Sequence, residues 1–476
     1  MPDTQVEAVE VTTIGSRLAK TPILSGIVHA NDFYLHQLIL MTPRRNIDIR
    51  GMMVEASYYE DIFKGSVSGH ILMSDAINVI DVNGLSGNEF LKFSFRKSKE
   101  EDVNEINKYF RVYRVGERIL NNNQTENYTL HFCSEELFLS EQTKISKSYS
   151  NIISDIVYDI LSNHLKIDDK RINVNKTEGI YDFVVPYKKP FETINWLANY
   201  AIRTKPTEAR AVDYVFFEDA SGFNFVSLSN LMLKPAYQSY IYGPKNINRV
   251  EKSQVENLGI DFFGIKSYTF LDTFDTLYGT VSGAFSNRLI TVDPLLRQHR
   301  STTFDYLKDY QNVRDSQTSS PLVNNLKNRL DKTQNENYDA VLKVMVSNSN
   351  QKFADGIESK SSAVSSDVRV ETYVPNRTAQ IALSHYIRLK LSLAGDPHLT
   401  VGRTIQVELP STGINDDASL DQQYSGKYLI TAVRHIISSQ MKYETIVEVA
   451  RDSFAKRLGN FIGSDKLLSK AIKGEK

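Results

Sequence analysis

Residues 426–449, GKYLITAVRHIISSQMKYETIVEV, carry the clearest strand pattern in the chain. From 428 to 433 and again from 443 to 449, two sets of side chains alternate position by position, which is the period of two that a strand with one buried face requires. The polar stretch Ser438-Ser439-Gln440 separates the two runs. We therefore predict that two strands pair here as a β-hairpin, within a β-rich region that extends from about 338 to 454.

A similar pattern occurs nearer the start of the chain. Residues 90–96 alternate in the same way, 128–133 repeat the signal, and Asn83-Gly84 is a dipeptide that favours a tight turn between strands. The composition agrees, because the chain has 25 Tyr and 23 Phe, and aromatic residues favour strands. We predict that residues 23–148 form an all-β module, either a barrel or a sandwich.

The pattern changes after Ser148. Apolar residues between 152 and 161 recur at three- and four-residue spacing, which is typical of an amphipathic helix, and a second helix is expected to open at Pro190. Residues 181–185 and 215–226 favour strands, and the latter form a predicted hairpin that turns at 220–222. Residues 149–232 are therefore predicted to be a small inserted α/β unit.

These patterns divide the chain into seven parts. We expect an extended arm (1–22), the first β module (23–148), the inserted α/β unit (149–232), a mixed connecting region (233–313), a polar linker (314–337), a second β module with a short helix near 377–385 (338–454), and a basic tail (455–476). The tail holds six Lys and Arg against two acidic residues. The favoured interpretation is a solvated end of the chain, and the alternative is a docking segment for an acidic partner.

Composition excludes several classes of protein. With 56 Lys and Arg against 57 Asp and Glu, the net charge of −1 argues against a dedicated nucleic-acid binder. A single cysteine, Cys133, excludes an internal disulfide framework and a Cys-rich zinc site, and it fits synthesis in a reducing compartment. We expect neither a membrane span nor a signal peptide, because no apolar run approaches about 18 residues and acidic residues precede the first basic one.

No motif commits the chain to catalysis. Phosphate-binding glycine loops and the HExxH zinc pair are absent, and the residue midway between Gly65 and Gly69 is Val67, where a nucleophile elbow requires serine. His70, His131 and His435 lie in strand-like stretches and are read as ordinary hydrogen-bonded or surface histidines. Trp196 is read as a packing anchor. We therefore predict no catalytic residues, no cofactor and no metal site.

Two stretches have a more specific pattern. The first runs from Gly69 to Glu89, and the second runs from Ile387 to Thr445. In this order and spacing they resemble the two barrels of the central baseplate hub proteins of contractile-tailed bacteriophages, which are similar to late-control tail proteins and to type VI secretion spikes. Residues 279–293 also resemble part of this family, and the likeness covers about three quarters of the chain. The motif positions, all interpreted as structural, are Gly69, Asp75, Asn78, Gly87, Glu89, Gly395, Pro397, Gly402, Gly426, Tyr428, His435 and Tyr443.

The resemblance implies a mainly β fold with two tail-tube-like antiparallel β-barrels in tandem. Gly395 and Gly402 are expected to supply the turns between strands of the second barrel, and Gly426 to open the strand that carries Tyr428. The inserted unit is expected to lie on the outside or the rim of the assembly.

The resemblance also implies a function. A hub of this family is a homotrimer whose six barrels form a pseudo-six-fold ring, and such a ring adapts a six-fold tail tube to a three-fold spike. Its expected partners are the spike protein, the tail tube or tube-initiator protein and the wedge proteins. The ring encloses a channel for genome ejection, so phage DNA would pass without specific binding. The lumen is then expected to be neutral or acidic, because a basic lining would hold phosphates. The expected location is the virion baseplate, after synthesis in the host cytoplasm.

Two other classes stay open on the sequence alone. One is a β-domain binding module such as an adhesin, although the chain shows no convincing internal repeat. The other is a cell-wall hydrolase component of a tail, which would need a carboxylate pair or a metal constellation.

Overall fold

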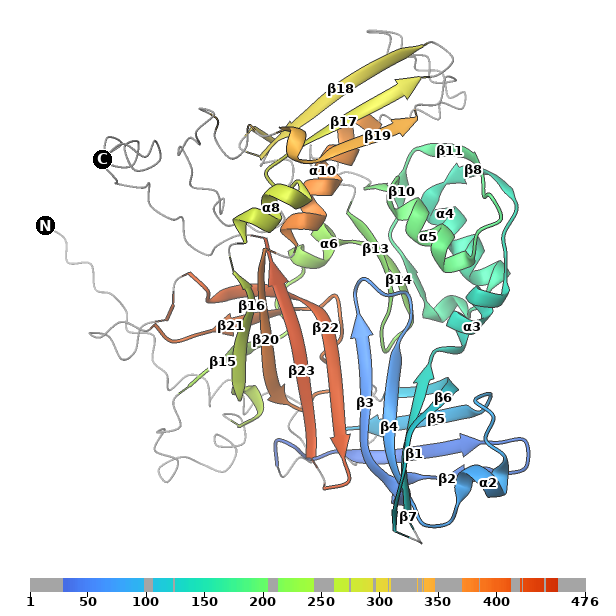
Figure 1. Cartoon of the computed structure of the whole chain (residues 1–476). Helices are drawn as coiled ribbons and strands as arrows, with labels where there is room; N and C mark the ends of the chain where they lie inside the picture. Colours follow the sequence, from blue (N-terminus) through green and yellow to red (C-terminus); the bar gives the residue numbers. More distant parts are fainter. Residues whose placement is uncertain are drawn as a thin grey trace, which may run out of the picture.

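The computed structural model shows a mainly β protein in which long strands dominate and helices cover one end (Figure 1). This confirms the mainly β character of the predicted fold class. No helix in the described part of the chain is long and apolar enough to cross a membrane. The predicted arm (1–22) and tail (455–476) lie outside the described residues, as does almost all of the linker (314–337). The structure describes residues 29–97, 106–122, 125–203, 213–243, 261–273, 275–293, 297–306, 308–309, 332, 336, 338–346, 370–384, 386–411, 420–421, 423–440 and 442–452.

The first β module is an antiparallel arrangement of seven strands with two short helices and one 3-10 turn among the described residues. The predicted strands at 90–96 and 128–133 are both present. The elements are β1 (Tyr34–Met41), β2 (Asn46–Asp48), η2 (Arg50–Met52), β3 (Met53–Asp61), β4 (Ser68–Asp75), α2 (Val79–Asn83), β5 (Phe90–Arg96), β6 (Ile106–Asn122), β7 (Thr125–Cys133) and α3 (Glu135–Gln142).

The Asn83-Gly84 dipeptide does not turn a hairpin, and that prediction was wrong. Asn83 is the last residue of α2, and Gly84 caps the helix with a φ of 64° while its amide donates to the Ile80 carbonyl. A left-handed residue is needed equally at a helix C-terminus and in a hairpin turn. The dipeptide alone therefore cannot distinguish the two.

The inserted unit mixes short strands with helices, as predicted. Its first helix continues into a π-helical turn, its second helix begins at Pro190, and the strands flanking 219–222 form the expected hairpin. The elements are β8 (Ser148–Ile152), α4 (Ile153–Asp159), η3 (Ile160–His164), η4 (Asp169–Arg171), β9 (Ile172–Val174), β10 (Thr177–Glu178), β11 (Ile180–Val184), α5 (Pro190–Ala198), β12 (Ile202–Arg203), β13 (Tyr214–Glu218), β14 (Phe223–Ser227) and α6 (Leu228–Leu233).

The remaining elements form the second β module and a small separate sheet. The second module contains β20 (Ile387–Ala394), β21 (Thr404–Glu408), β22 (Gly426–Ser438) and β23 (Lys442–Arg451). Its sheet is extended by β15 (Ser239–Ile241) and β16 (Ser267–Thr273), which come from the predicted connecting region 233–313. Strands β22 and β23 are the predicted hairpin, with Ser438 opposite Lys442. The separate sheet and its helices comprise α8 (Thr276–Ser282), β17 (Ser286–Asp293), β18 (Gln298–Asp305), η7 (Tyr338–Ala340), β19 (Leu342–Val346) and α10 (Val370–Leu383).

Helix α10 differs from the short helix expected near 377–385. It begins at Val370 and contains Pro375. The buried amide of Asn287 donates to the Pro375 carbonyl at 3.1 Å. A proline inside a helix normally disfavours the turn before it, so the sequence does not predict the N-terminal half of α10. The contact from β17 helps to hold this half in place.

The two β modules share one sheet. Thirteen strands are connected in the order β16-β20-β23-β22-β3-β4-β7-β6-β5-β1-β2, with β21 and β15 attached beside β22. The modules meet where β3 pairs antiparallel with β22, from Glu55 opposite Ser438 to Asp61 opposite Ala432. Along this path the described strands do not return to close a ring.

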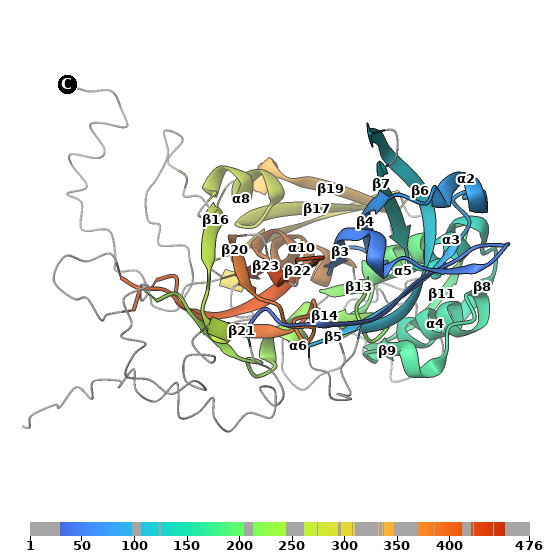
Figure 2. The same ribbon diagram turned by 90° about the horizontal axis from the view of Figure 1, so that it is seen from below.

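The apolar side chains gather in three main clusters. One lies under β20–β23 and includes Leu389 and Val447, a second lies within the first module and includes Phe93 and Phe132, and the third fills the inserted unit. Figures 1 and 2 both place β8, α4 and α5 of the inserted unit on the side of the molecule away from β16. One face of the continuous sheet covers the first two clusters. The opposite face therefore carries the polar residues of the same strands.

Candidate functional site

A polar face runs across the central strands, on the side of the sheet opposite the apolar clusters. It consists of the alternate residues of β16, β20, β23, β22, β3, β4, β7 and β6, which the register places in continuous rows. Six of its residues are acidic and six are basic, so their formal charges cancel. The charged members are Glu55, Asp61, Glu117, Asp272, Glu444 and Glu448, with Arg111, Arg114, Arg388, Lys390, Arg434 and Lys442.

Ion pairs neutralise neighbouring charges along the polar face. The Arg388 guanidinium donates to the Asp272 carboxylate at 2.6 Å, from β20 to β16. Arg434 donates to the Ser57 hydroxyl at 3.0 Å and to Glu55 at 3.3 Å, across the junction of the two modules. These side chains are about one-third exposed. Such pairs contribute at most about 1 kcal/mol each, so their main effect is on the potential of the surface.

Two histidines face each other in the middle of the polar face. His70 on β4 lies opposite His131 on β7, with ring centroids 6.1 Å apart. Burial lowers the pKa of both rings, and the positive charges of Arg434 and Arg114 lower those of His70 and His131 further. Both rings are therefore uncharged at neutral pH, and they add no net charge to the face.

The first group of motif residues shapes the connection between β4 and β5. The buried carboxylate of Asp75 accepts hydrogen bonds from the amides of Ile77 (2.8 Å) and Val79 (2.6 Å) and from the Tyr128 hydroxyl (3.1 Å). Asn78, with a φ of 56°, leads into α2. These contacts satisfy backbone donors at the start of a short helix, which is a structural role.

Gly87 and Glu89 organise the next turn, and Gly69 lies within β4. The Glu89 carboxylate is buried and accepts from the amides of residues 86, 87 and 88 at 2.7–3.0 Å. Gly87 has a φ of 79°. A Cβ on Gly69 would lie 2.2 Å from the Phe132 ring, so only glycine permits that ring to cross the strand.

The second group of motif residues meets at the junction of the two modules. The Tyr443 hydroxyl lies 2.8 Å from His435 Nδ1, and the His435 ring contacts Tyr58 of the first module at a centroid distance of 5.8 Å. Burial lowers the pKa of His435 to about 3, so it is a neutral core residue. A Cβ on Gly395 would lie 2.1 Å from the Tyr443 ring. Gly395 follows the last residue of β20, and glycine is required there for the close approach of the Tyr443 ring; its φ is not positive.

The remaining motif residues support strand β22. Gly402 adopts a φ of 78° and donates its amide to the Ile430 carbonyl at 3.0 Å, as a turn glycine should. Gly426 opens β22 as expected. The Tyr428 hydroxyl donates to the Tyr424 carbonyl at 2.7 Å. Pro397 lies between Asp396 and His398, where the Asp396 carboxylate accepts from the His398 amide at 2.9 Å.

Sequence reasoning missed two buried carboxylates at the junctions. The first, Glu60, accepts from the Tyr58 hydroxyl at 3.0 Å and from the Val401 amide at 3.1 Å, and so links the two modules. Burial, together with the negative charge of Asp219, raises the pKa of Glu60 to about 8. Glu60 is therefore mostly protonated at neutral pH.

The second, Glu218, joins the inserted unit to the first module. It accepts from the Val67 amide at 3.0 Å, from the Ser134 hydroxyl, and from Lys108 at 3.1 Å. Its side chain is fully buried. In the sequence, the buried role of Glu218 is indicated only by its position directly after the apolar run Val215-Phe216-Phe217. Its partners lie far away in the chain, so the sequence does not identify them.

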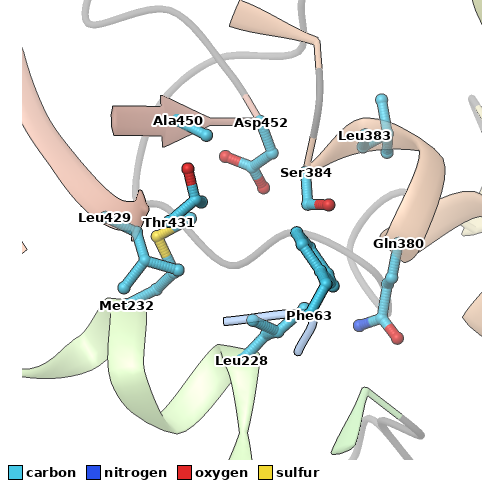
Figure 3. A pocket seen from close by; sticks show the side chains of 10 residues that line it. All are labelled: Phe63, Leu228, Met232, Gln380, Leu383, Ser384, Leu429, Thr431, Ala450 and Asp452. Carbon is cyan, nitrogen blue, oxygen red and sulfur yellow. The ribbon is translucent and has the colours of Figure 1, made fainter. Parts of the chain in front are cut away.

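Two hollows lie beside this framework. A small one of about 10 Å³ is enclosed by side chains of α6, α10, β22 and β23 together with Phe63 (Figure 3). A larger one of about 650 Å³, termed here the α10 cavity, lies between α5, β13, α8, β19 and α10. No group of three or more His, Cys, Asp or Glu able to hold a metal ion occurs among the described residues.

Comparison with known proteins gives one curated relative. No family model matches the chain. Over 197 residues, which are 39% of this chain, it is 25% identical to the probable baseplate hub protein gp334 of Vibrio phage KVP40. The match covers 45% of that protein, so less than half of the relative's length is represented.

Three solved structures that match the chain are distant from it in sequence. The tail protein from Neisseria meningitidis MC58 is 10% identical, with a TM-score of 0.46 over 88% of this chain and 97% of that one. The 43 kDa tail protein of prophage MuSo2 from Shewanella oneidensis is 10% identical, with a TM-score of 0.47 over 89% and 100%. The E. coli c3393 protein, a component of the type VI secretion system, is 9% identical, with a TM-score of 0.41 over 90% and 78%.

The curated match confirms the predicted resemblance: across 39% of its length, this chain is similar to a probable bacteriophage baseplate hub protein.

Proposed function

We propose that the chain is a non-catalytic, structural baseplate hub subunit of a contractile phage tail. In this proposal three chains form a ring, the polar face lines its channel, and phage DNA passes through without specific binding. The ring joins the six-fold tail tube or its initiator to the three-fold spike, and wedge proteins contact it from outside. The protein would then reside in the virion baseplate after synthesis in the host cytoplasm.

The observation that carries this proposal is the balanced charge of the polar face. Phosphate binding gains its free energy from counterion release at Lys and Arg, and six carboxylates among six cations offset that attraction. A surface of this kind, spread over a continuous sheet, suits the passage of DNA better than its retention. The predicted neutral lumen is consistent with it.

The junction of the two modules supports the ring. Strands β3 and β22 join the modules edge to edge through a heterologous contact. If a comparable contact recurs between chains, three chains present six module positions and the ring closes. We propose that residues 23–148 and 338–454 are the cores of two tube-like barrels that close in the assembly, with 233–313 completing them and 149–232 at the rim.

Negative-stain imaging with mass photometry tests this proposal. The purified chain is measured alone and with the spike protein encoded beside it. We expect particles of three chains, about 162 kDa from 54.1 kDa each, with an open centre. Compact monomers under both conditions would refute the hub assignment. Clearing of cell walls by the purified chain would instead support the hydrolase alternative.

A further inference from the structure

The α10 cavity has the size and lining of a binding site. Its volume of about 650 Å³ falls in the range of roughly 300–1,000 Å³ that is typical of ligand pockets. Aromatic rings and two cations line it, and none of the described lining residues is Asp or Glu. The aromatic residues are Phe63, Tyr200, Tyr214, Phe216 and Tyr278, and the cations are Lys343 and Arg377.

The two cations are held close to each other. Lys343 donates to the Thr378 hydroxyl at 2.7 Å, while Arg377 donates to Asn199 at 3.1 Å and to the Tyr214 carbonyl at 3.3 Å. Burial and the positive charge of Arg377 lower the pKa of Lys343. A carboxylate beside Lys343 would favour its charged form and offset this repulsion.

Strand β19 forms one wall of the cavity and has an open edge. It pairs with β17, and with no other described strand. Alternate residues Val341, Lys343 and Met345 line the cavity, whereas Leu342 and Val344 are exposed at 52% and 62%. An unpaired edge is a template for an added strand, and the side chains of that strand would alternate between the cavity and the outside.

A segment of complementary chemistry lies outside the described structure. Residues 3–14, DTQVEAVEVTTI, contain three carboxylates and no Lys or Arg, and seven of the twelve are β-branched residues that favour strands. Fourteen residues lie between Ile14 and His29, where the described chain begins, which allows a reach of about 50 Å.

We propose that residues 3–14 of this chain add to the free edge of β19 as a strand, with the Glu7 carboxylate paired to Lys343 inside the α10 cavity. Because strand side chains alternate, Val9 and Val11 then share the cavity side with Glu7 and contact the aromatic lining. Glu10 points away from the cavity. Docking of this segment requires neither the trimer nor the channel, so its test is independent of the hub proposal.

Hydrogen exchange on the full-length protein tests the docking. The β19 amides are compared in wild type, E7K, K343E and the double variant E7K/K343E, with E10K as the matched control. We expect the single cavity variants to lower β19 protection by about tenfold or more, E10K to leave it within about twofold, and the double variant to restore most of it, because the reversed pair attracts again.

Three results would overturn the proposal. They are unprotected β19 amides in wild type, equal effects of E7K and E10K, and a double variant that behaves like the sum of its single changes. Thermal unfolding of each variant checks that global stability has not changed.

Discussion

At the scale of single residues, the junctions depend on groups whose protonation is set by burial. Glu60 and His435 are both fully buried where the two modules meet, and burial keeps each of them neutral. The pKa of Glu60 rises to about 8 and that of His435 falls to about 3. The junction is therefore built around neutral polar groups whose charging would weaken it.

The first prediction concerns Glu60 and pH. In the unfolded chain Glu60 ionises near its ordinary pKa of 4.5, whereas in the fold it keeps its proton to about pH 8. Between these values the native state binds more protons, so stability falls as pH rises. We expect E60Q to exceed wild type by about 1–3 kcal/mol at pH 8 and to match it near pH 4. Urea unfolding at both pH values measures this, and a parallel change in E448Q, at the half-buried Glu448 of the polar face, would contradict it.

The second prediction concerns Gly395. An added methyl group would overlap the buried Tyr443 ring, whereas nothing lies within 4 Å of a Cβ on Gly51. We expect G395A to lower stability by about 1–3 kcal/mol or more, because overpacking forces the ring or the backbone to shift. G51A serves as the control and should change stability by less than about 0.5 kcal/mol. Equal melting temperatures for the two variants would show that the Tyr443 ring relaxes without cost.

At the scale of elements, the structure depends on contacts that fasten one unit to the next. Strand β22 is paired with β3 along seven positions, from Ser438 to Ala432, and so makes the two modules one sheet. Strand β13 ends in Glu218, whose carboxylate contacts the first module. Loss of this carboxylate would leave the buried Val67 amide without its acceptor.

The third prediction tests the fastening of the inserted unit. Removal of the Glu218 carboxylate would leave Lys108 with a buried charge and the Val67 amide without its acceptor. We expect E218A to destabilise the protein by about 3–5 kcal/mol, as is usual when one partner of a buried pair is lost. The same truncation at half-buried Glu448 should cost less than about 1 kcal/mol. Urea denaturation measures both, and similar midpoints would show that Glu218 is dispensable.

At the scale of the whole molecule, the polar face is the feature on which the proposed channel depends. Its charges cancel only because carboxylates from strands distant in sequence lie among the cations. Glu55 reaches Arg434 across the module junction, and Asp272 reaches Arg388 from an edge strand. The neutrality is thus a property of the assembled sheet.

The fourth prediction follows from this balance. Reversal of Glu55, Glu444 and Glu448 to Lys changes the formal charge of the face by six units and should make it bind DNA. We expect wild type to show little binding at physiological salt, and the triple variant to bind with an affinity that falls steeply with salt. Fluorescence anisotropy with double-stranded DNA at 50 and 200 mM salt measures this. Strong binding by wild type would exclude a neutral channel lining.

Local pattern was enough to predict many of the elements. The hairpin at 426–449, the helix that begins at Pro190 and the strands of the first module follow from spacing between near neighbours. Near neighbours also explain an error, because Asn83-Gly84 serves a helix end as well as a turn. The sequence around Gly395 likewise does not reveal the Tyr443 ring that would overlap a Cβ at that position.

By itself, the sequence determined the mainly β class, most of the strand and helix positions, and the likeness to a baseplate hub protein, because periodicity and motif spacing are properties of contiguous residues. Only the tertiary structure decided that the two modules share a sheet, that Glu60 meets Val401 at a separation of 341 residues, and that Glu218 meets Val67 at 151. Such pairings depend on long-range contacts and on the burial that they create. Neither can be recognised from the residues adjacent in sequence.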